Sequence, residues 1–132
     1  MAGIEGGCLC GAVRYRIEGP PLYSVICHCR SCRRAGSAAA VAWLTFERDR
    51  FRLIAGQPHS FRSSAGTVRT HCGTCGSPLT FTSARRPEQV DVTTCSLDDP
   101  ERFPPTREVW LADRLRWGPS DPALEHFAEG GD

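Results

Sequence analysis

Eight cysteines, most of them in tight groups, constrain this chain more than any other feature. Two follow a CxC pattern, three follow CxCxxC, two follow CxxC, and one stands alone. They are Cys8 and Cys10, then Cys27, Cys29 and Cys32, then Cys72 and Cys75, and finally Cys95. Such close spacing is typical of metal ligation, whereas disulfides belong to oxidising compartments and to small domains without a core. We therefore expect metal sites rather than a disulfide framework.

The first pair, Cys8 and Cys10, occupies the stretch "GGCLCGAV". On an extended segment, residues two positions apart point to the same face. Both sulfurs can then reach one metal ion, and Leu9 is expected to point away from them into packing.

The pair Cys72 and Cys75 occupies "HCGTCGSPL", between two strand candidates. Gly76 follows, where a tight turn favours a positive φ, so the motif is interpreted as a knuckle at a hairpin tip. Together with the CxC pair it would make a closed four-cysteine zinc site with Zn–S distances of about 2.3 Å. Two separate half-sites, or buried free thiols, are the alternatives.

The group Cys27, Cys29 and Cys32 supplies three sulfurs to a metal that usually takes four ligands. His28 should face away from its two cysteine neighbours on an extended segment, which makes it a poor fourth ligand. Cys95 is the remaining thiol and could close the site only if the sheet brings it near. The fourth position could otherwise hold water or substrate, and such an open site can activate what it binds. The spacing leaves these four alternatives open.

Composition and charge exclude several classes of protein. The chain has 132 residues, which fits one domain over 1–132, and 40% of them are hydrophobic. The net charge of +1 lacks the basic excess that is typical of nucleic-acid-binding proteins. No apolar run is long enough to predict a membrane span. The start "MAGIEGGCLCGAV" lacks the features of a secretory signal, so we expect a cytoplasmic protein. All 16 basic residues other than histidine are Arg, a bias that points to a GC-rich bacterial genome.

The residue pattern predicts a mainly β, antiparallel fold with only short helical turns. Short alternating or apolar runs are separated by Gly and Pro turn signals. The expected strands are 12–17, 22–27, 38–46, 51–56, 60–64, 67–72, 79–83 and 89–95. One or two helical turns are expected in 29–36, ending at Gly36 in a left-handed conformation, and a capped turn in 96–103.

Several stretches, in order, resemble the glutathione-dependent formaldehyde-activating enzyme family. They are "GGCLCGAVRYRI", "CHCRSCRRAGSAAAVAW", "HCGTCGSPL", "CSLDDP" and "REVWLADRLRW". The resemblance covers a core of about residues 6–127 and implies a β-tent fold held by zinc. It implies a structural zinc on Cys8, Cys10, Cys72 and Cys75, and a second, substrate-binding zinc on Cys27, Cys29 and Cys32. The residue before the CxxC is often aromatic in this family, whereas here it is His71, expected either to line the second site or to pack.

The resemblance implies a zinc-dependent carbon–sulfur lyase. Glutathione would bind the second zinc as thiolate and would form or release S-hydroxymethylglutathione. The alternatives are a non-catalytic glutathione-binding protein and a zinc interaction module. The oligomeric state is left open.

Some neighbouring side chains are candidates for substrate binding. Arg30, Arg33 and Arg34 flank the second group and could hold the carboxylates of glutathione, although a solvated arginine cluster explains them equally well. The tryptophans are expected in the core rather than in a substrate platform. They are Trp43, Trp110 and Trp117.

Overall fold

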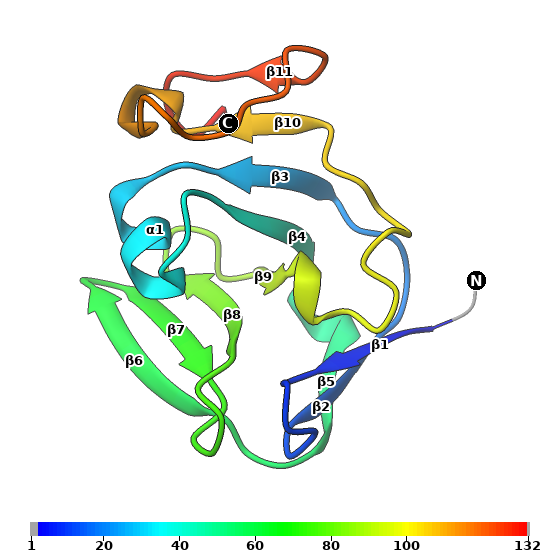
Figure 1. Ribbon diagram of the computed structural model, residues 1–132. Helices are drawn as coiled ribbons and strands as arrows, with labels where there is room; N and C mark the ends of the chain where they lie inside the picture. The colour runs from blue at the N-terminus through cyan, green and yellow to red at the C-terminus, as the bar shows by residue number, and fades with distance from the viewer. Residues whose placement is uncertain (1–2, 132) are drawn as a thin grey trace.

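The computed structural model describes residues 3–131 and is mainly β, as the sequence predicts (Figure 1). Its strands in that range are β1 (Ile4–Gly7), β2 (Arg14–Ile17), β3 (Tyr23–Cys27), β4 (Val41–Glu47), β5 (Phe51–Ala55), β6 (His59–Ser64), β7 (Thr67–His71), β8 (Pro78–Ser83), β9 (Gln89–Thr93), β10 (Arg107–Val109) and β11 (Glu125–His126). The helices are α1 (Arg30–Gly36) and three short 3₁₀ turns, η1 (Arg48–Arg50), η2 (Thr94–Ser96) and η3 (Leu111–Asp113).

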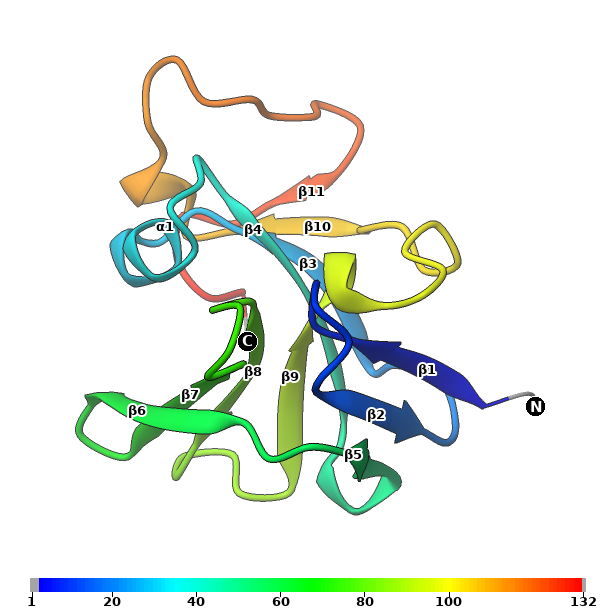
Figure 2. The same ribbon diagram turned by 60° about the horizontal axis from the view of Figure 1, so that its bottom comes forward.

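The strands form two sheets. The smaller has the order β1-β2-β5, and the larger has the order β11-β10-β3-β4-β9-β8-β7-β6. Figures 1 and 2 show the large sheet bending, so that the β6–β7 hairpin comes round beneath α1 while β10 and β11 lie at the other end. The small sheet stands beside β4 and β9 (Figure 2), and its buried side chains pack against residues of those strands.

Local sequence explains the individual strands. In β2 the arginines face outward while Tyr15 and Ile17 are fully buried, which is the alternation of a half-buried strand. β4 lies in the middle of the large sheet, between β3 and β9, and its central residues are buried without alternation. A continuous apolar run is what a strand covered on both faces requires.

Three strands and one feature of the strand pairing depart from the sequence prediction. β1, β10 and β11 were not expected, because each is short and weakly patterned. β10 pairs in parallel with both β3 and β11, whereas antiparallel pairing was expected throughout. The left-handed residue that ends α1 is Ser37 (φ 48°) rather than Gly36.

The expected packing of two kinds of apolar residue is wrong in part. Leu9 lies in a turn and its side chain is 89% exposed, because the chain bends between the two cysteines instead of running extended. Trp43 is buried as expected, but Trp110 and Trp117 are 38% and 76% exposed. Trp117 lies in the loop between β10 and β11.

Two buried clusters hold the sheets together. The larger joins the small sheet to β4, β8 and β9, with Tyr15 stacked on Phe51 at 5.3 Å between ring centroids. The smaller surrounds Cys27, Cys32 and Trp43 at the other end of the large sheet. None of the described residues forms a helix that is long and apolar enough to cross a membrane.

Candidate metal centres

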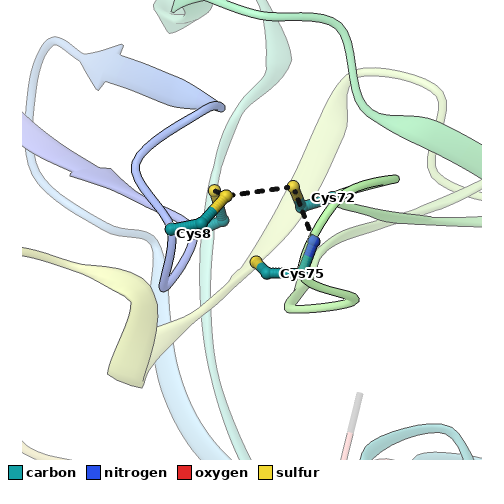
Figure 3. Close-up of side chains that lie close together, drawn as sticks. Cys8, Cys72 and Cys75 are labelled. Carbon is teal, nitrogen blue, oxygen red and sulfur yellow. Dashed lines mark hydrogen bonds between the residues drawn. The ribbon is translucent and has the colours of Figure 1, made fainter.

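The first centre joins the N-terminal loop to the turn between β7 and β8. The sulfurs of Cys8, Cys10, Cys72 and Cys75 all lie within 4.8 Å of one another. Figure 3 shows Cys8 facing Cys72 and Cys75 across this space. The Sγ–Sγ distances are 3.6 Å from Cys8 to Cys10 and 3.8 Å from Cys10 to Cys72. Four sulfurs at the corners of a tetrahedron around zinc would lie about 3.8 Å apart, so this donor set fits the ion.

Backbone and hydroxyl groups surround these sulfurs with hydrogen-bond donors. The amide of Val13 donates to Cys8 Sγ at 3.2 Å, and the amide of Thr74 donates to Cys72 Sγ at 3.3 Å. The amide of Cys75 donates to Cys72 Sγ at 3.4 Å (Figure 3). Donors of this kind stabilise thiolates and orient metal ligands. Gly76 has φ +80°, as the knuckle requires, and its amide donates to the carbonyl of Cys72.

Hydrogen bonding also prepares Cys75 to act as a thiolate. The side chain and backbone of Ser77 lower the pKa of Cys75 to about 5. The Ser77 hydroxyl lies 3.1 Å from Cys75 Sγ and also accepts a hydrogen bond from the amide of Leu9 at 3.0 Å. Ser77 therefore connects the two loops of the first centre.

The second centre lies where β3 passes into α1. The sulfurs of Cys27, Cys29 and Cys32 also lie within 4.8 Å of one another. Cys27 ends β3, Cys29 is the N-cap of α1, and Cys32 is in the first turn of that helix. The amide of Cys32 donates to Cys29 Sγ at 3.3 Å, so the sulfur of Cys29 takes the place of the usual oxygen at a helix N-cap.

These three sulfurs interact strongly with one another. Hydrogen bonds from Cys27 and Cys32 lower the pKa of Cys29 to about 2, with a smaller contribution from the charge of Arg69. The same interaction with Cys29 raises the pKa of Cys27, whose burial acts in the same direction. Cys29 therefore forms a thiolate readily, stabilised by the S–H groups of Cys27 and Cys32. A bound metal ion would replace those protons and stabilise all three sulfurs as thiolates.

The structure removes two of the four alternatives for a fourth ligand. His28 faces away from the sulfurs, and its Nε2 lies 2.7 Å from Glu108 Oε1. Cys95 is exposed and belongs to neither group. Residues 3–131 bring no fourth Cys, His, Asp or Glu atom to the second group.

Glu108 holds the loop of the second centre against the C-terminal segment, and sequence reasoning did not identify it. Its carboxylate is 1% exposed and accepts from His28, from the Ser120 hydroxyl at 3.0 Å and from the Asp121 amide at 2.9 Å. Burial alone would raise the pKa of Glu108, but the hydrogen bonds from these three partners outweigh it and lower the pKa. No local sequence motif predicts this role, because His28 lies 80 residues before Glu108, and Ser120 and Asp121 lie 12 and 13 residues after it.

A cleft of about 260 Å³ opens over the three sulfurs of the second centre. Its apolar walls include Tyr23, Trp43, Phe81 and Trp110. Its charged lining is three arginines and one carboxylate, none of which the sequence singled out. They are Arg69, Arg86, Arg107 and Asp91. A small apolar cavity with a few converging polar groups is the usual form of a ligand site.

The arginines that the sequence did single out lie elsewhere. Arg30 and Arg34 line a second cavity, about 540 Å³, between α1 and the β6–β8 strands. Arg33 lines neither cavity, and its Nε donates to the carbonyl of His28 at 3.3 Å. His71 also lines the second cavity, where its ring meets that of His59 at 5.8 Å.

Two comparisons with known proteins name the same family, and a third shows a similar fold. A family model described as "Glutathione-dependent formaldehyde-activating enzyme" matches residues 3–113. A curated protein of Halomonas elongata, named "Putative glutathione-dependent formaldehyde-activating enzyme", is 32% identical over 124 residues, which covers 86% of this chain and 78% of that protein. A Rhodobacter sphaeroides protein of known crystal structure is similar in fold, with a TM-score of 0.62 at 23% identity over 76% of this chain and 97% of the other.

Proposed function

From the premise that the chain belongs to the glutathione-dependent formaldehyde-activating enzyme family, we propose that it is a zinc-dependent carbon–sulfur lyase acting on S-hydroxymethylglutathione. The observation that carries the proposal is the second centre. Three converging sulfurs line a cleft of about 260 Å³, and residues 3–131 supply no further Cys, His, Asp or Glu ligand to that group.

Two zinc ions suit the two donor sets. The first centre has four sulfurs and would be structural, since a closed thiolate site leaves no position for substrate. The second has three sulfurs, from Cys27, Cys29 and Cys32. Zinc held there would supply a Lewis-acidic position at which the substrate thiol loses its proton.

The residues of the cleft would bind and orient the two reactants. Trp43 and Phe81 meet edge to face at 6.2 Å and form an apolar part of the cleft lining. In the forward direction the glutathione sulfur attacks the carbonyl carbon of formaldehyde, the C–S bond forms, and the carbonyl oxygen takes a proton. The reverse direction breaks the C–S bond and returns that proton, so neither direction needs an oxidant or a reductant.

Zinc analysis together with an exchange experiment tests the proposal. Wild type should contain two zinc ions per chain, and Cys27→Ser should contain one while keeping its fold, because the first centre is intact. NMR exchange spectroscopy on glutathione mixed with formaldehyde should show faster adduct exchange with wild type than with Cys27→Ser. A tenfold acceleration corresponds to about 1.4 kcal/mol of barrier.

Cys95→Ser is the matched control, because Cys95 is a cysteine outside both groups. It should keep both zinc ions and the full acceleration. If the protein contains two zinc ions and binds glutathione but does not accelerate adduct exchange, it is a glutathione carrier and not a lyase. No glutathione binding at all would leave an interaction module or a protein for another thiol.

A further inference from the structure

We propose that Arg69 and Arg107 recognise the two carboxylates of the thiol substrate, one on each side of the cleft. The inference rests on the proposed function, because it places the substrate sulfur at the second centre. Arg69 is in β7 and Arg107 in β10, and four strands separate β7 from β10 in the large sheet. The bend of that sheet brings both side chains to the lining of one cleft.

Arg69 stands next to the sulfurs with hydrogen-bonding capacity unused. Its Nη2 lies 3.8 Å from Cys32 Sγ, and its guanidinium lies over the rings of Phe81 and Trp43, at 4.9 and 5.9 Å from their centroids. Its Nε is buried without a hydrogen-bond partner, and no carboxylate among residues 3–131 forms an ion pair with it. Two aromatic rings therefore hold a charged, planar donor in place beside a sulfur of the second centre.

Arg107 is held in the same way farther from the sulfurs. Its guanidinium lies between Tyr23, at 5.2 Å, and Phe127, at 5.0 Å, and no carboxylate in the described part of the chain pairs with it. In the parallel pairing of β10 with β3, Val109 is opposite Cys27 and Arg107 is opposite Val25. Residues two apart on a strand share a face and lie about 7 Å apart. Arg107 is therefore on the same face of β10 as Val109, the residue opposite Cys27, and about 7 Å farther along the strand.

The charges of the cleft match a dicarboxylate. Its lining has three arginines and one acid, and the acid, Asp91, forms an ion pair with Arg86 at 2.9 Å and accepts from the Thr45 hydroxyl at 2.6 Å. That pairing neutralises Arg86 and leaves the positive charges of Arg69 and Arg107. Glutathione carries two carboxylates, one on its glycine and one on its γ-linked glutamate. Guanidinium groups bind such carboxylates through paired, charge-assisted hydrogen bonds.

The positions assign one carboxylate to each arginine. The glycyl carboxylate is separated from the sulfur by fewer bonds than the γ-glutamyl carboxylate. Arg69, which touches a sulfur of the centre, is therefore assigned the glycyl carboxylate, and Arg107 is assigned the γ-glutamyl carboxylate. Gly130, which lines the cleft, and Phe127, whose ring contacts Arg107, lie beyond the family match, which ends at residue 113.

Calorimetric binding to the zinc-loaded protein tests the assignment without depending on turnover. The ligands are glutathione, its glycyl ethyl ester, and 4-aminobutyryl-cysteinylglycine, which lacks the γ-glutamyl carboxylate. Arg69→Gln and Arg107→Gln should each weaken glutathione binding roughly 10- to 100-fold, the range for a lost hydrogen bond to a charged group. Arg69→Gln and wild type should bind the glycyl ester with equal affinity, because the ester lacks the carboxylate assigned to Arg69. Arg107→Gln and wild type should likewise bind the aminobutyryl peptide with equal affinity.

Three controls separate recognition from folding. Arg62→Gln removes an exposed arginine that lines neither cavity and should leave glutathione affinity unchanged. Arg69→Lys keeps the charge without the planar fork and should fall between Arg69→Gln and wild type. Every variant should retain two zinc ions and the wild-type unfolding midpoint.

The outcomes distinguish this inference from the proposed function. The assignment is wrong, while the lyase proposal stands, if the glutamine variants bind glutathione as tightly as wild type does. It is also wrong if removing an arginine and removing its assigned carboxylate weaken binding by independent amounts that add. If S-methylglutathione binds wild type as tightly as glutathione, the sulfur does not reach the metal, and the proposed function fails while the arginine dependence remains. Wild type without measurable glutathione affinity overturns both.

Discussion

Glu108→Ala should destabilise the protein more than any other single change of a carboxylate. The side chain is 1% exposed and accepts hydrogen bonds from His28, Ser120 and Asp121. Removing it leaves buried donors without partners, each worth about 1–3 kcal/mol. His28 is fully buried and its Nδ1 already has no partner among the described residues, so both ring nitrogens would then be unpaired.

We expect a loss of about 3–5 kcal/mol in the free energy of unfolding, the usual cost of breaking a buried, hydrogen-bonded pair. Glu108→Gln preserves the shape but turns a donor toward one of these donors, so it should lose about 1–3 kcal/mol. Because His28 lies between Cys27 and Cys29, both variants should also bind the second zinc about 10- to 100-fold more weakly.

Urea unfolding followed by tryptophan fluorescence measures the stability, and competition with a chelator measures the zinc affinity. Glu88→Ala is the control, because that side chain is exposed, and it should change stability by no more than about 0.5 kcal/mol. The reasoning is refuted if Glu108→Ala loses less than about 1 kcal/mol with an unchanged dependence on urea, since a buried network would then contribute nothing.

Three further predictions follow from the structure. The pKa of Glu108 is lower in the folded protein than in the unfolded chain, where it is about 4.3. The stability that this difference provides is complete above a pH of about 4.3 and is lost as the pH falls through the folded-state pKa. Wild type should therefore lose more stability on acidification than Glu108→Gln, and parallel acid-unfolding profiles of the two proteins would contradict this. Gly56→Ala should cost about 2–4 kcal/mol by thermal unfolding, because φ is +73° and a Cβ would lie 2.1 Å from the Ala12 carbonyl oxygen. Gly11→Ala has a similar φ of +81° with open space around it and should cost only about 1 kcal/mol; equal losses would show that the contact is unimportant. Cys75→Ser should lose one zinc per chain by elemental analysis and abolish cooperative unfolding, whereas a retained transition would show that the first centre does not hold the fold.

Much of this molecule is specified over short distances along the chain. The CxC, CxCxxC and CxxC spacings each bring their own sulfurs together locally, through a seven-residue helix or a tight turn. The meeting of the CxC pair with the CxxC pair in the first centre, across 62 residues, depends on the tertiary structure. The alternating and apolar runs predict eight strands, each of which appears within a few residues of its expected limits. These features depend on backbone periodicity and turn chemistry, which nearby residues determine.

Tertiary structure decided the rest, because it depends on which strands become neighbours. The parallel pairing of β10 with β3 places Glu108 against His28 and Arg107 near Cys27, across about 80 residues of sequence. Spacing along the chain favoured Arg30 and Arg33 for substrate binding, since they adjoin the cysteines, yet both lie outside the cleft over the three sulfurs. A side chain's neighbours in a sheet are set by strand order and register, and those are properties of the whole fold rather than of any one segment.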